Sequence, residues 1–191
     1  LPTPHDYVLG PDAYLEQIRK LKSEVGVPVI ASLNGVTDSG WLHYARLIQE
    51  AGADALELNV YSNALTLRES ALAIEDRVVR MVQQVVTETP LPIAVKLSPF
   101  WTSFGHLATR IESSGANGLV LFNRFYQPDI DPERLEVALT LKLSSPSELL
   151  LRLRWLAQLS GRTTLSLSCS GGAHTANDVL KAVLAGAHSV Q

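Results

Sequence analysis

The chain has 191 residues, of which 46% are hydrophobic and 18% are charged, and its formal net charge is -3. This length suffices for one globular domain with a substantial core and falls short of two. The slightly acidic balance offers no basic field for nucleic acid or an anionic membrane. No apolar run reaches the roughly 18 residues that a membrane-spanning helix needs, and a single cysteine, Cys169, excludes a disulfide framework. We expect a soluble, cytoplasmic protein with neither nucleic acid nor a membrane as a partner.

Both ends of the sequence suggest a piece of a longer protein. The chain starts at Leu1 without a methionine and stops at Gln191, in what reads as the beginning of a strand. A strand cut there would leave unpaired backbone groups and exposed apolar side chains. We therefore expect the sequence to be a fragment.

Apolar runs of strand length alternate with segments of helical period, which is typical of strand–helix units around a parallel sheet. The strands are rich in Val, Leu, Ile and Ala, as expected when both faces are covered. They are predicted over residues 27–33, 55–60, 92–97, 118–122, 164–169 and a truncated 188–191. The intervening helices are predicted over residues 14–24, 41–50, 67–87, 104–113, 146–159 and 176–184.

A short repeat marks three of the helix-to-strand junctions. Residues 51–53 and 185–187 read Ala-Gly-Ala, and residues 114–116 read Ser-Gly-Ala. Glycine there suits the left-handed residue that closes a helix. The alternation fits either a doubly wound sheet or an incomplete eight-stranded (β/α)8 TIM barrel, and we favour the barrel because polar residues recur at the carboxyl ends of the strands. We expect one partial barrel domain over residues 1–191, with a polar functional or interaction loop over residues 124–146.

Lys96 is the strongest candidate for a functional residue. It interrupts an apolar strand, where a charge needs a partner or a ligand. Alternation along strands places Glu57 and Asn59 on one face, and Asn123 ends another strand. A site lysine forms a Schiff base or stabilises an anion on a substrate or cofactor; the structural alternative is a salt bridge to Glu57. Each asparagine alone also suits a turn.

The segment Ser170-Gly171-Gly172 follows a strand and precedes a helix. Its bare amides and the helix N-terminus suit a phosphate, although a plain turn fits equally well. Cys169 reads as a core residue, and the histidines show no metal spacing, so we predict no metal. Arg124 adds a cation beside Asn123, where an acidic substrate could bind.

Several stretches together resemble the dihydroorotate dehydrogenase family of flavin-binding barrels. They are VIASLNG at 29–35, AGADALELN at 51–59, AVKLSP at 94–99, GLVLFN at 118–123 and residues 170–191. The strings FNRFYQPDID at 122–131 and LRWL at 153–156 are similar to a bacterial branch labelled dihydroorotate dehydrogenase-like.

The resemblance implies an eight-stranded barrel with FMN at its mouth, of which this chain covers the third strand to the start of the eighth. It implies an oxidoreductase of pyrimidine biosynthesis that acts on CH–CH donors. A hydride would pass to flavin from a small-molecule dihydropyrimidine, either dihydroorotate or a related cyclic amide. The resemblance is also compatible with a homodimer.

The resemblance also assigns roles to individual residues. It places Lys96 by the flavin N1 and C2 oxygen, where charge develops on reduction. It implies that Gly171 and Gly172 approach the FMN phosphate. The residues expected to hydrogen-bond the pyrimidine ring and carboxylate are Asn59, Asn63 and Asn123.

The family's ELN-x-S-C-P-N stretch appears here as ELNVYSN, over residues 57–63, without its cysteine and proline. Ser62 is the nearest candidate for the catalytic base, with Tyr61 as a second.

Two alternative functions stay open: a degenerate barrel that binds FMN or a phosphorylated ligand without turnover, and a lysine Schiff-base aldolase. Without the first two strands the barrel cannot close, so we expect the 191-residue piece alone to bind FMN weakly or not at all.

Overall fold

A computed structural model gives the arrangement of most of the chain. It describes residues 10–34, 38–61, 66–124, 128–138 and 142–191. Ser62 and Asn63, two of the predicted site residues, lie outside the described residues.

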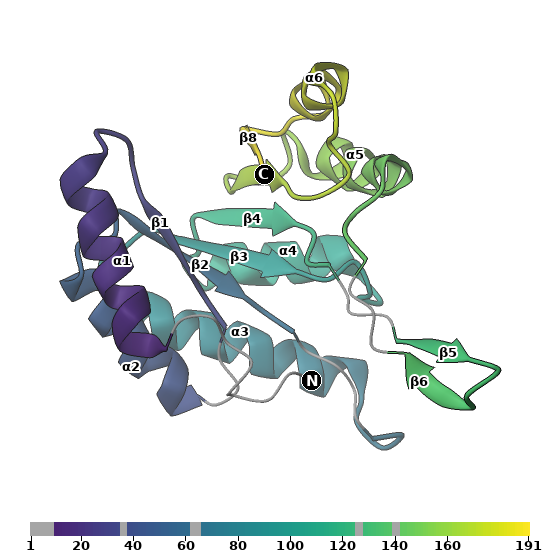
Figure 1. Ribbon diagram of the computed structural model, residues 1–191. Helices are drawn as coiled ribbons and strands as arrows, with labels where there is room; N and C mark the ends of the chain where they lie inside the picture. Colours follow the sequence, from purple (N-terminus) through teal and green to yellow (C-terminus); the bar gives the residue numbers. More distant parts are fainter. Residues whose placement is uncertain (1–9, 35–37, 62–65, 125–127, 139–141) are drawn as a thin grey trace.

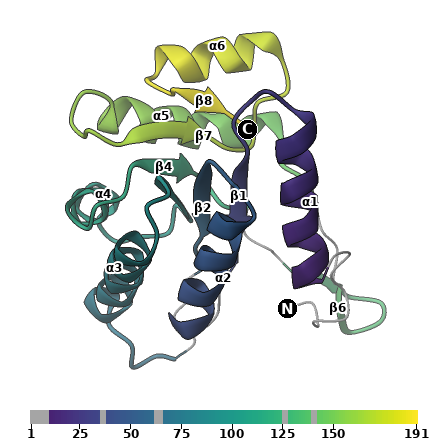
Figure 2. The same ribbon diagram turned by 90° about the vertical axis from the view of Figure 1, so that its left-hand side faces the viewer.

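Six parallel strands form one sheet whose spatial order follows the sequence. They are β1 (Ile30–Leu33), β2 (Ala55–Asn59), β3 (Ile93–Leu97), β4 (Gly118–Leu121), β7 (Ser166–Cys169) and β8 (Ser189–Val190). A doubly wound sheet reverses its order at a switch point, whereas this order does not reverse. The sheet curls into a half-barrel with helices along its outer side (Figures 1 and 2), which confirms the incomplete barrel.

The predicted helices are all present. They are α1 (Pro11–Glu24), α2 (Asp38–Glu50), α3 (Ala71–Glu88), α4 (Phe104–Ser113), α5 (Leu149–Leu159) after the 3-10 turn η2 (Pro146–Glu148), and α6 (Ala176–Leu184). Helix α3 begins at Ala71 rather than at residue 67, because the Ser70 hydroxyl caps it by accepting from the Ala73 amide at 3.2 Å. None of the helices in the described ranges is both long and apolar enough to cross a bilayer.

Alternation along the strands separates an apolar row from a polar row. On β3, Ile93, Val95 and Leu97 are at most 1% exposed and belong to the main core. Ala94 and Lys96 alternate with them and are only partly buried. The helices cover one face of the sheet (Figure 2), so the apolar row packs against them and the polar row lines the inner face.

Side-chain hydrogen bonds delimit the start of β1 and satisfy backbone groups at its open edge. The Val29 amide donates to the Asp54 carboxylate at 2.6 Å, so the regular ladder starts only at Ile30. At the edge away from β2, the Tyr14 hydroxyl of α1 accepts from the Ser32 amide at 2.9 Å and donates to the Ser32 carbonyl at 3.0 Å. One phenol therefore satisfies both backbone groups of a residue at the sheet edge.

The long connection after β4 contains a small hairpin that the sequence did not predict. Its strands are β5 (Asp129–Asp131) and β6 (Glu136–Ala138), paired antiparallel with Ile130 opposite Val137. The hairpin projects away from the sheet (Figure 1). Three-residue strands with exposed side chains carry too little apolar alternation to stand out from a polar loop.

Two glycines after β7 let the chain turn against α5. Gly171 and Gly172 have φ angles of 82° and 83°, and a Cβ on Gly172 would lie 2.6 Å from the Leu149 amide nitrogen. The turn therefore needs glycine for its backbone conformation and for its close approach to the start of α5.

We predict that Gly172→Ala lowers the free energy of unfolding by about 3 kcal/mol or more, because left-handed strain adds to a clash with backbone atoms. Gly161 is the matched control, since it has a φ of 70° but no atom within 4 Å of an added Cβ. Gly161→Ala should cost only about 1 kcal/mol. Urea unfolding measures both, and equal losses would contradict the packing explanation.

Candidate functional site

An ion pair occupies the inner face of the half-barrel. The Lys96 ammonium on β3 lies 3.5 Å from the Glu57 carboxylate on β2. Their side chains are only 17% and 8% exposed. The salt bridge that the sequence allowed is thus present, and it places two opposite charges on the face that carries the polar row.

Two further side chains join this pair. Gln191, directly after β8, accepts from Lys96 Nζ at 3.1 Å and donates to Glu57 Oε2 at 2.9 Å. Ser32 on β1 donates to Glu57 Oε1 at 3.2 Å. Strands from both edges of the sheet therefore contribute to one polar cluster, defined here as Ser32, Glu57, Lys96 and Gln191.

Asn59 lies in the same register row as Lys96, one strand away. Its Oδ1 is buried and has no hydrogen-bond partner among the described residues. Beside it lies Tyr61, which is half-exposed, and its partial burial raises the pKa of its phenol. A hydrogen bond with Asn59 acts in the opposite direction, and the Glu57 charge adds to the increase. Tyr61 is therefore protonated at neutral pH.

Asn123 is fixed at the carboxyl ends of β2 and β3. Its Nδ2 donates to the Val60 carbonyl at 2.9 Å and to the Lys96 carbonyl at 3.0 Å. Two carbonyl partners determine which end of the amide is the nitrogen. The remaining Oδ1 is buried and has no partner in the part of the chain that the structure describes.

The same end of the sheet holds a third buried oxygen of this kind. Val120 on β4 is in register with Lys96 on one side and with Ser168 of β7 on the other, so Ser168 belongs to the same row. The Ser168 Oγ is buried and has no partner among the described residues. Buried polar atoms are normally hydrogen-bonded, and exceptions call for an explanation. Near the Lys96 cation, Asn59 and Asn123 thus offer acceptors that suit a polar ligand with N–H or O–H groups.

The Gly171–Gly172 turn lies next to this polar cluster. The Gly171 amide donates to the Gln191 carbonyl at 3.5 Å, and the Gln191 side chain contacts Lys96. The Gly172 amide donates to the Ser144 hydroxyl at 3.1 Å. The turn therefore reaches the Lys96 region through one residue, Gln191.

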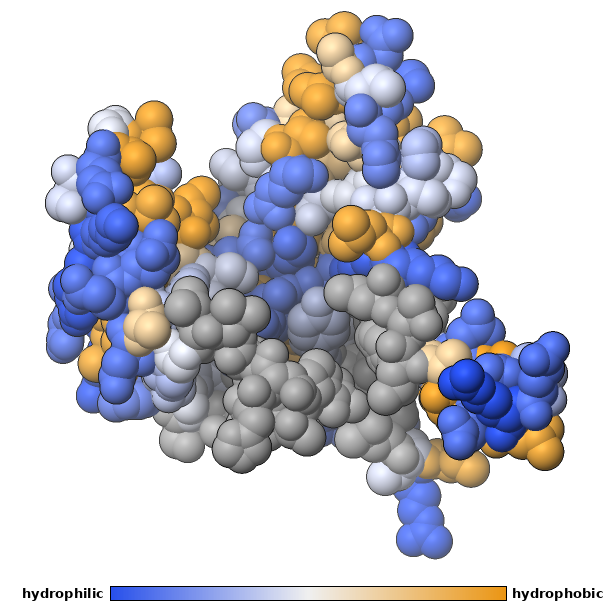
Figure 3. Space-filling view, in the orientation of Figure 1, coloured by the Kyte–Doolittle hydropathy of each residue, from blue (hydrophilic) through white to orange (hydrophobic). Residues whose placement is uncertain are grey.

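Figure 3 shows this side of the molecule hollowed between the α1 side and the α6 side, with hydrophilic residues in the hollow. Predicted site residues Lys96, Asn59, Asn123 and the two glycines surround one end of the sheet, whereas Ser62 and Asn63 fall outside the described residues. Cys169 is a core residue, as predicted, and burial raises the pKa of its thiol.

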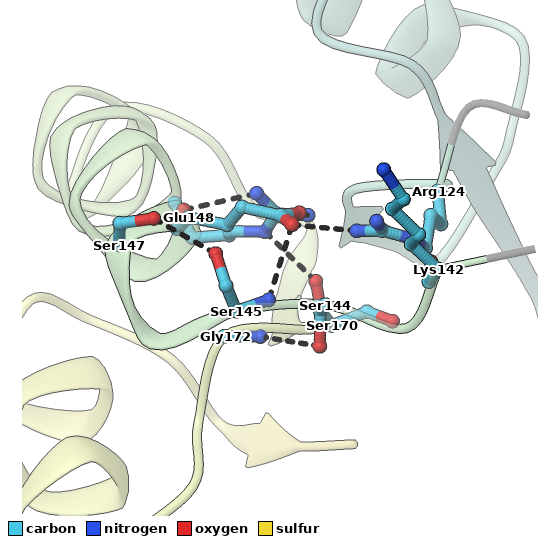
Figure 4. A network of polar contacts seen from close by, with 9 residues as sticks. Arg124, Lys142, Ser144, Ser145, Ser147, Glu148, Ser170 and Gly172 are labelled. Carbon is cyan, nitrogen blue, oxygen red and sulfur yellow. Dashed lines mark hydrogen bonds and ion pairs between the residues drawn. The ribbon is translucent and has the colours of Figure 1, made fainter. Parts of the chain in front are cut away.

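A second polar network beside the glycines contains residues that the sequence reasoning missed. Arg124 donates to the Glu148 carboxylate at 2.5 Å and to the Lys142 carbonyl (Figure 4). The charge of Arg124 is therefore paired with Glu148 within the chain, and its role toward an acidic substrate stays a prediction.

Arg152 interrupts a run of leucines on α5, as the exposed Arg154 also does. The signal that could have identified Arg152 is its helical spacing with Leu149 and Leu156, which places it on the buried face. No three His, Cys, Asp or Glu side chains in the described ranges are grouped to hold a metal ion.

The chain is similar in sequence to a known family of enzymes. The family model for dihydroorotate dehydrogenase matches residues 8–191. Dihydroorotate dehydrogenase A (fumarate) of Limosilactobacillus reuteri is 35% identical over 174 residues, covering 86% of this chain and 56% of the relative. The catalytic subunit of dihydroorotate dehydrogenase B (NAD(+)) from Halalkalibacterium halodurans is 30% identical over 175 residues, covering 88% of this chain and 57% of the relative. The chain thus spans somewhat more than half the length of these relatives.

Solved structures match the fold. A dihydroorotate dehydrogenase from Eimeria tenella, in complex with ferulenol, gives a TM-score of 0.67 at 19% identity over 95% of this chain and 58% of that one. A deoxyribose phosphate aldolase from Aeropyrum pernix gives 0.65 at 22% identity over 95% and 70%. At these identities the structures support only the fold, whereas the family model extends over almost the whole sequence. By its sequence, this chain belongs to the dihydroorotate dehydrogenase family.

Proposed function

We propose that the protein containing this chain is an FMN-dependent oxidoreductase that transfers a hydride to flavin from a dihydropyrimidine, either dihydroorotate or a related cyclic amide. Family membership over residues 8–191 supports the class of reaction. The observation that carries the proposal is the combination of the Lys96 cation with the buried oxygens of Asn59 and Asn123, which have no partner among the described residues.

These residues fit a flavin and a pyrimidine in their hydrogen-bonding chemistry. Both rings present N–H donors and carbonyl acceptors along one edge, which require acceptors and donors from the protein. Asn59 Oδ1 and Asn123 Oδ1 are free acceptors among the described contacts, and Lys96 Nζ is a donor. FMN, when bound, would supply the two-electron acceptor.

Each residue has a separate task in this proposal. Lys96 would hold positive charge beside the flavin N1 and C2 oxygen, where negative charge develops on reduction. Asn59 and Asn123 would orient the pyrimidine, together with Asn63. Gly171 and Gly172 would lie by the FMN phosphate, because a turn with positive φ angles can present peptide N–H groups to an anion.

Ser62 remains the proposed base that removes the proton next to the departing hydride. A serine hydroxyl needs a group that relays its proton. Tyr61 is a poor substitute, because burial and the Glu57 charge raise the pKa of its phenol and leave little phenolate at neutral pH.

The first test is the absorption spectrum of the full-length protein, purified without added cofactor and treated anaerobically with dihydroorotate. We expect a flavin band that bleaches on addition of the substrate. Lys96→Ala should reduce both the flavin content and the rate of bleaching, since the developing charge loses its cation.

Each other spectral outcome contradicts part of the proposal. A band that persists across dihydropyrimidines and related cyclic amides would favour the binding barrel without turnover. Absence of a flavin band would contradict the proposal that the protein binds FMN. Borohydride trapping of a carbonyl compound on Lys96 would then test the aldolase alternative. Unchanged flavin content and turnover in Lys96→Ala would remove the role given to Lys96.

We predict that Glu57→Gln makes the reduction potential of the bound flavin more positive by about 20 mV, the equivalent of roughly 1 kcal/mol for a two-electron couple. The carboxylate 3.5 Å from Lys96 offsets part of its positive charge, and its removal favours the reduced, anionic flavin. Spectroelectrochemical titration measures the shift.

Glu75→Gln is the matched control for this potential. Glu75 is a buried carboxylate on α3 that pairs with Arg110 at 3.5 Å, in the helical layer rather than on the inner face. Its removal should leave the potential unchanged. An unchanged or more negative potential in Glu57→Gln would refute the electrostatic link between Glu57 and Lys96.

We predict that Ser62→Ala lowers the rate of flavin reduction by about 10²- to 10⁴-fold, the usual contribution of a general base, while flavin content stays the same. Tyr61→Phe should retain most of the rate. Anaerobic stopped-flow reduction compares the two variants. A larger loss in Tyr61→Phe would transfer the base role to the phenol.

A further inference from the structure

Arg152 is a buried cation on a helix whose other buried side chains are apolar. Its side chain is 5% exposed, and Leu149, Leu156 and Leu159 are the other buried residues of α5. Burial lowers the pKa of its guanidinium, which the Glu148 charge counteracts. A buried charge costs free energy, and apolar side chains of similar size often stabilise a fold equally well. The fixed geometry of the guanidinium therefore needs an explanation other than stability.

The hydrogen bonds of Arg152 are directed at the glycine turn and at the start of α5. Its Nε donates to the Ser170 carbonyl at 2.9 Å, and its Nη1 donates to the Glu148 carbonyl at 2.9 Å. Its Nη2 is 3.4 Å from the Glu148 carboxylate and 3.2 Å from the position of a Cβ on Gly171. The guanidinium thus lies directly against the backbone that begins the turn.

Glu148 holds this guanidinium in place. Its carboxylate accepts from the Ser145 amide at 3.1 Å and from Arg124 Nη1 at 2.5 Å. Figure 4 shows Glu148 between Arg124 on one side and Ser145 on the other. Burial raises the pKa of Glu148, but its hydrogen bonds and the two arginines outweigh burial, so the pKa lies below its ordinary value.

The turn is held from its other side as well. The Ser144 hydroxyl accepts from the Gly172 amide at 3.1 Å, and the Ser170 carbonyl also accepts from the Phe122 amide at 3.3 Å. Ser170 N in turn donates to the Leu121 carbonyl at 2.7 Å. Arg152 is the charged member of these contacts and the one that connects the turn to Glu148.

We propose that Arg152 is a positioning residue for the Gly171–Gly172 turn, and that it makes the flavin site selective for a phosphorylated ligand. This inference rests on the proposed FMN function. By fixing the Ser170 carbonyl, Arg152 fixes where the following peptide groups lie. An anion held by backbone groups requires them in one orientation. The region of Lys96, where the flavin ring would lie, contacts the turn only indirectly, through Gln191, so the ring should depend on the turn much less than the phosphate does.

The experiment compares the full-length protein with Arg152→Met and Arg152→Lys. Methionine removes the charge and the donors, and lysine keeps the charge but lacks the planar fork that reaches Ser170 and Glu148 together. Arg154→Met is the matched control, because Arg154 is an exposed arginine on the same helix. The apoproteins are titrated with FMN and, separately, with riboflavin.

We expect the Kd for FMN to rise by about 10- to 100-fold in both Arg152 variants, the loss expected for a charge-assisted hydrogen bond. The Kd for riboflavin should change less than about 3-fold, since riboflavin lacks the phosphate. Hydrogen exchange of the Gly171 and Gly172 amides in the apoprotein should be faster by about 10-fold or more, and unchanged in Arg154→Met.

Two results would overturn the inference. Equal weakening of FMN and riboflavin would show that Arg152 acts only through general stability, and unchanged amide exchange in both Arg152 variants would show that it does not position the turn. If the wild-type protein bound neither flavin, the proposed function would fail; the exchange rates would still decide whether Arg152 orders the turn. If Arg152→Met does not fold, Arg152→Lys carries the same comparison.

Discussion

The alternation of side chains on a curled parallel sheet is the constraint on which this site depends. One row, exemplified by Val95 and Leu97, packs against the helices and is almost completely buried. The other row can therefore be polar, and it places Lys96 and Glu57 3.5 Å apart on the inner face. A shift of one residue in register would exchange the two rows, burying the charges under the helices. The core and the site are two consequences of the same periodicity.

The polar end of the sheet is only partly satisfied by the chain itself. Glu57 has Ser32, Lys96 and Gln191 as partners, so its buried charge is well compensated. The oxygens of Asn59 and Asn123, in contrast, have no partner among the described residues. Buried acceptors without donors are costly unless a ligand supplies the donors. This asymmetry supports the proposed binding surface over a purely structural polar cluster.

Most of the architecture could be predicted because it has a short sequence period. The boundaries of α4 and α6 agree with the prediction, and the three glycines of the helix-to-strand repeat have the positive φ angles expected of them, 91°, 93° and 107°. The β5–β6 hairpin could not be predicted, since its strands are short and exposed. The start of β1 differed because the Asp54 side chain, rather than a strand partner, binds the Val29 amide.

The sequence by itself determined the parallel strand–helix alternation, the family, and the position of Lys96 as a charged residue within an apolar strand. Periodicity and an isolated charge in an apolar run are local properties, so they can be recognised without the fold. Only the tertiary structure decided which groups meet Lys96, and it brought Gln191 to it across 95 positions of sequence. The structure also decided that Arg124 is paired with Glu148, and that Arg152 lies against the Ser170 carbonyl. Such contacts depend on distances between separate strand–helix units, and these follow from the curvature of the whole sheet rather than from any one segment.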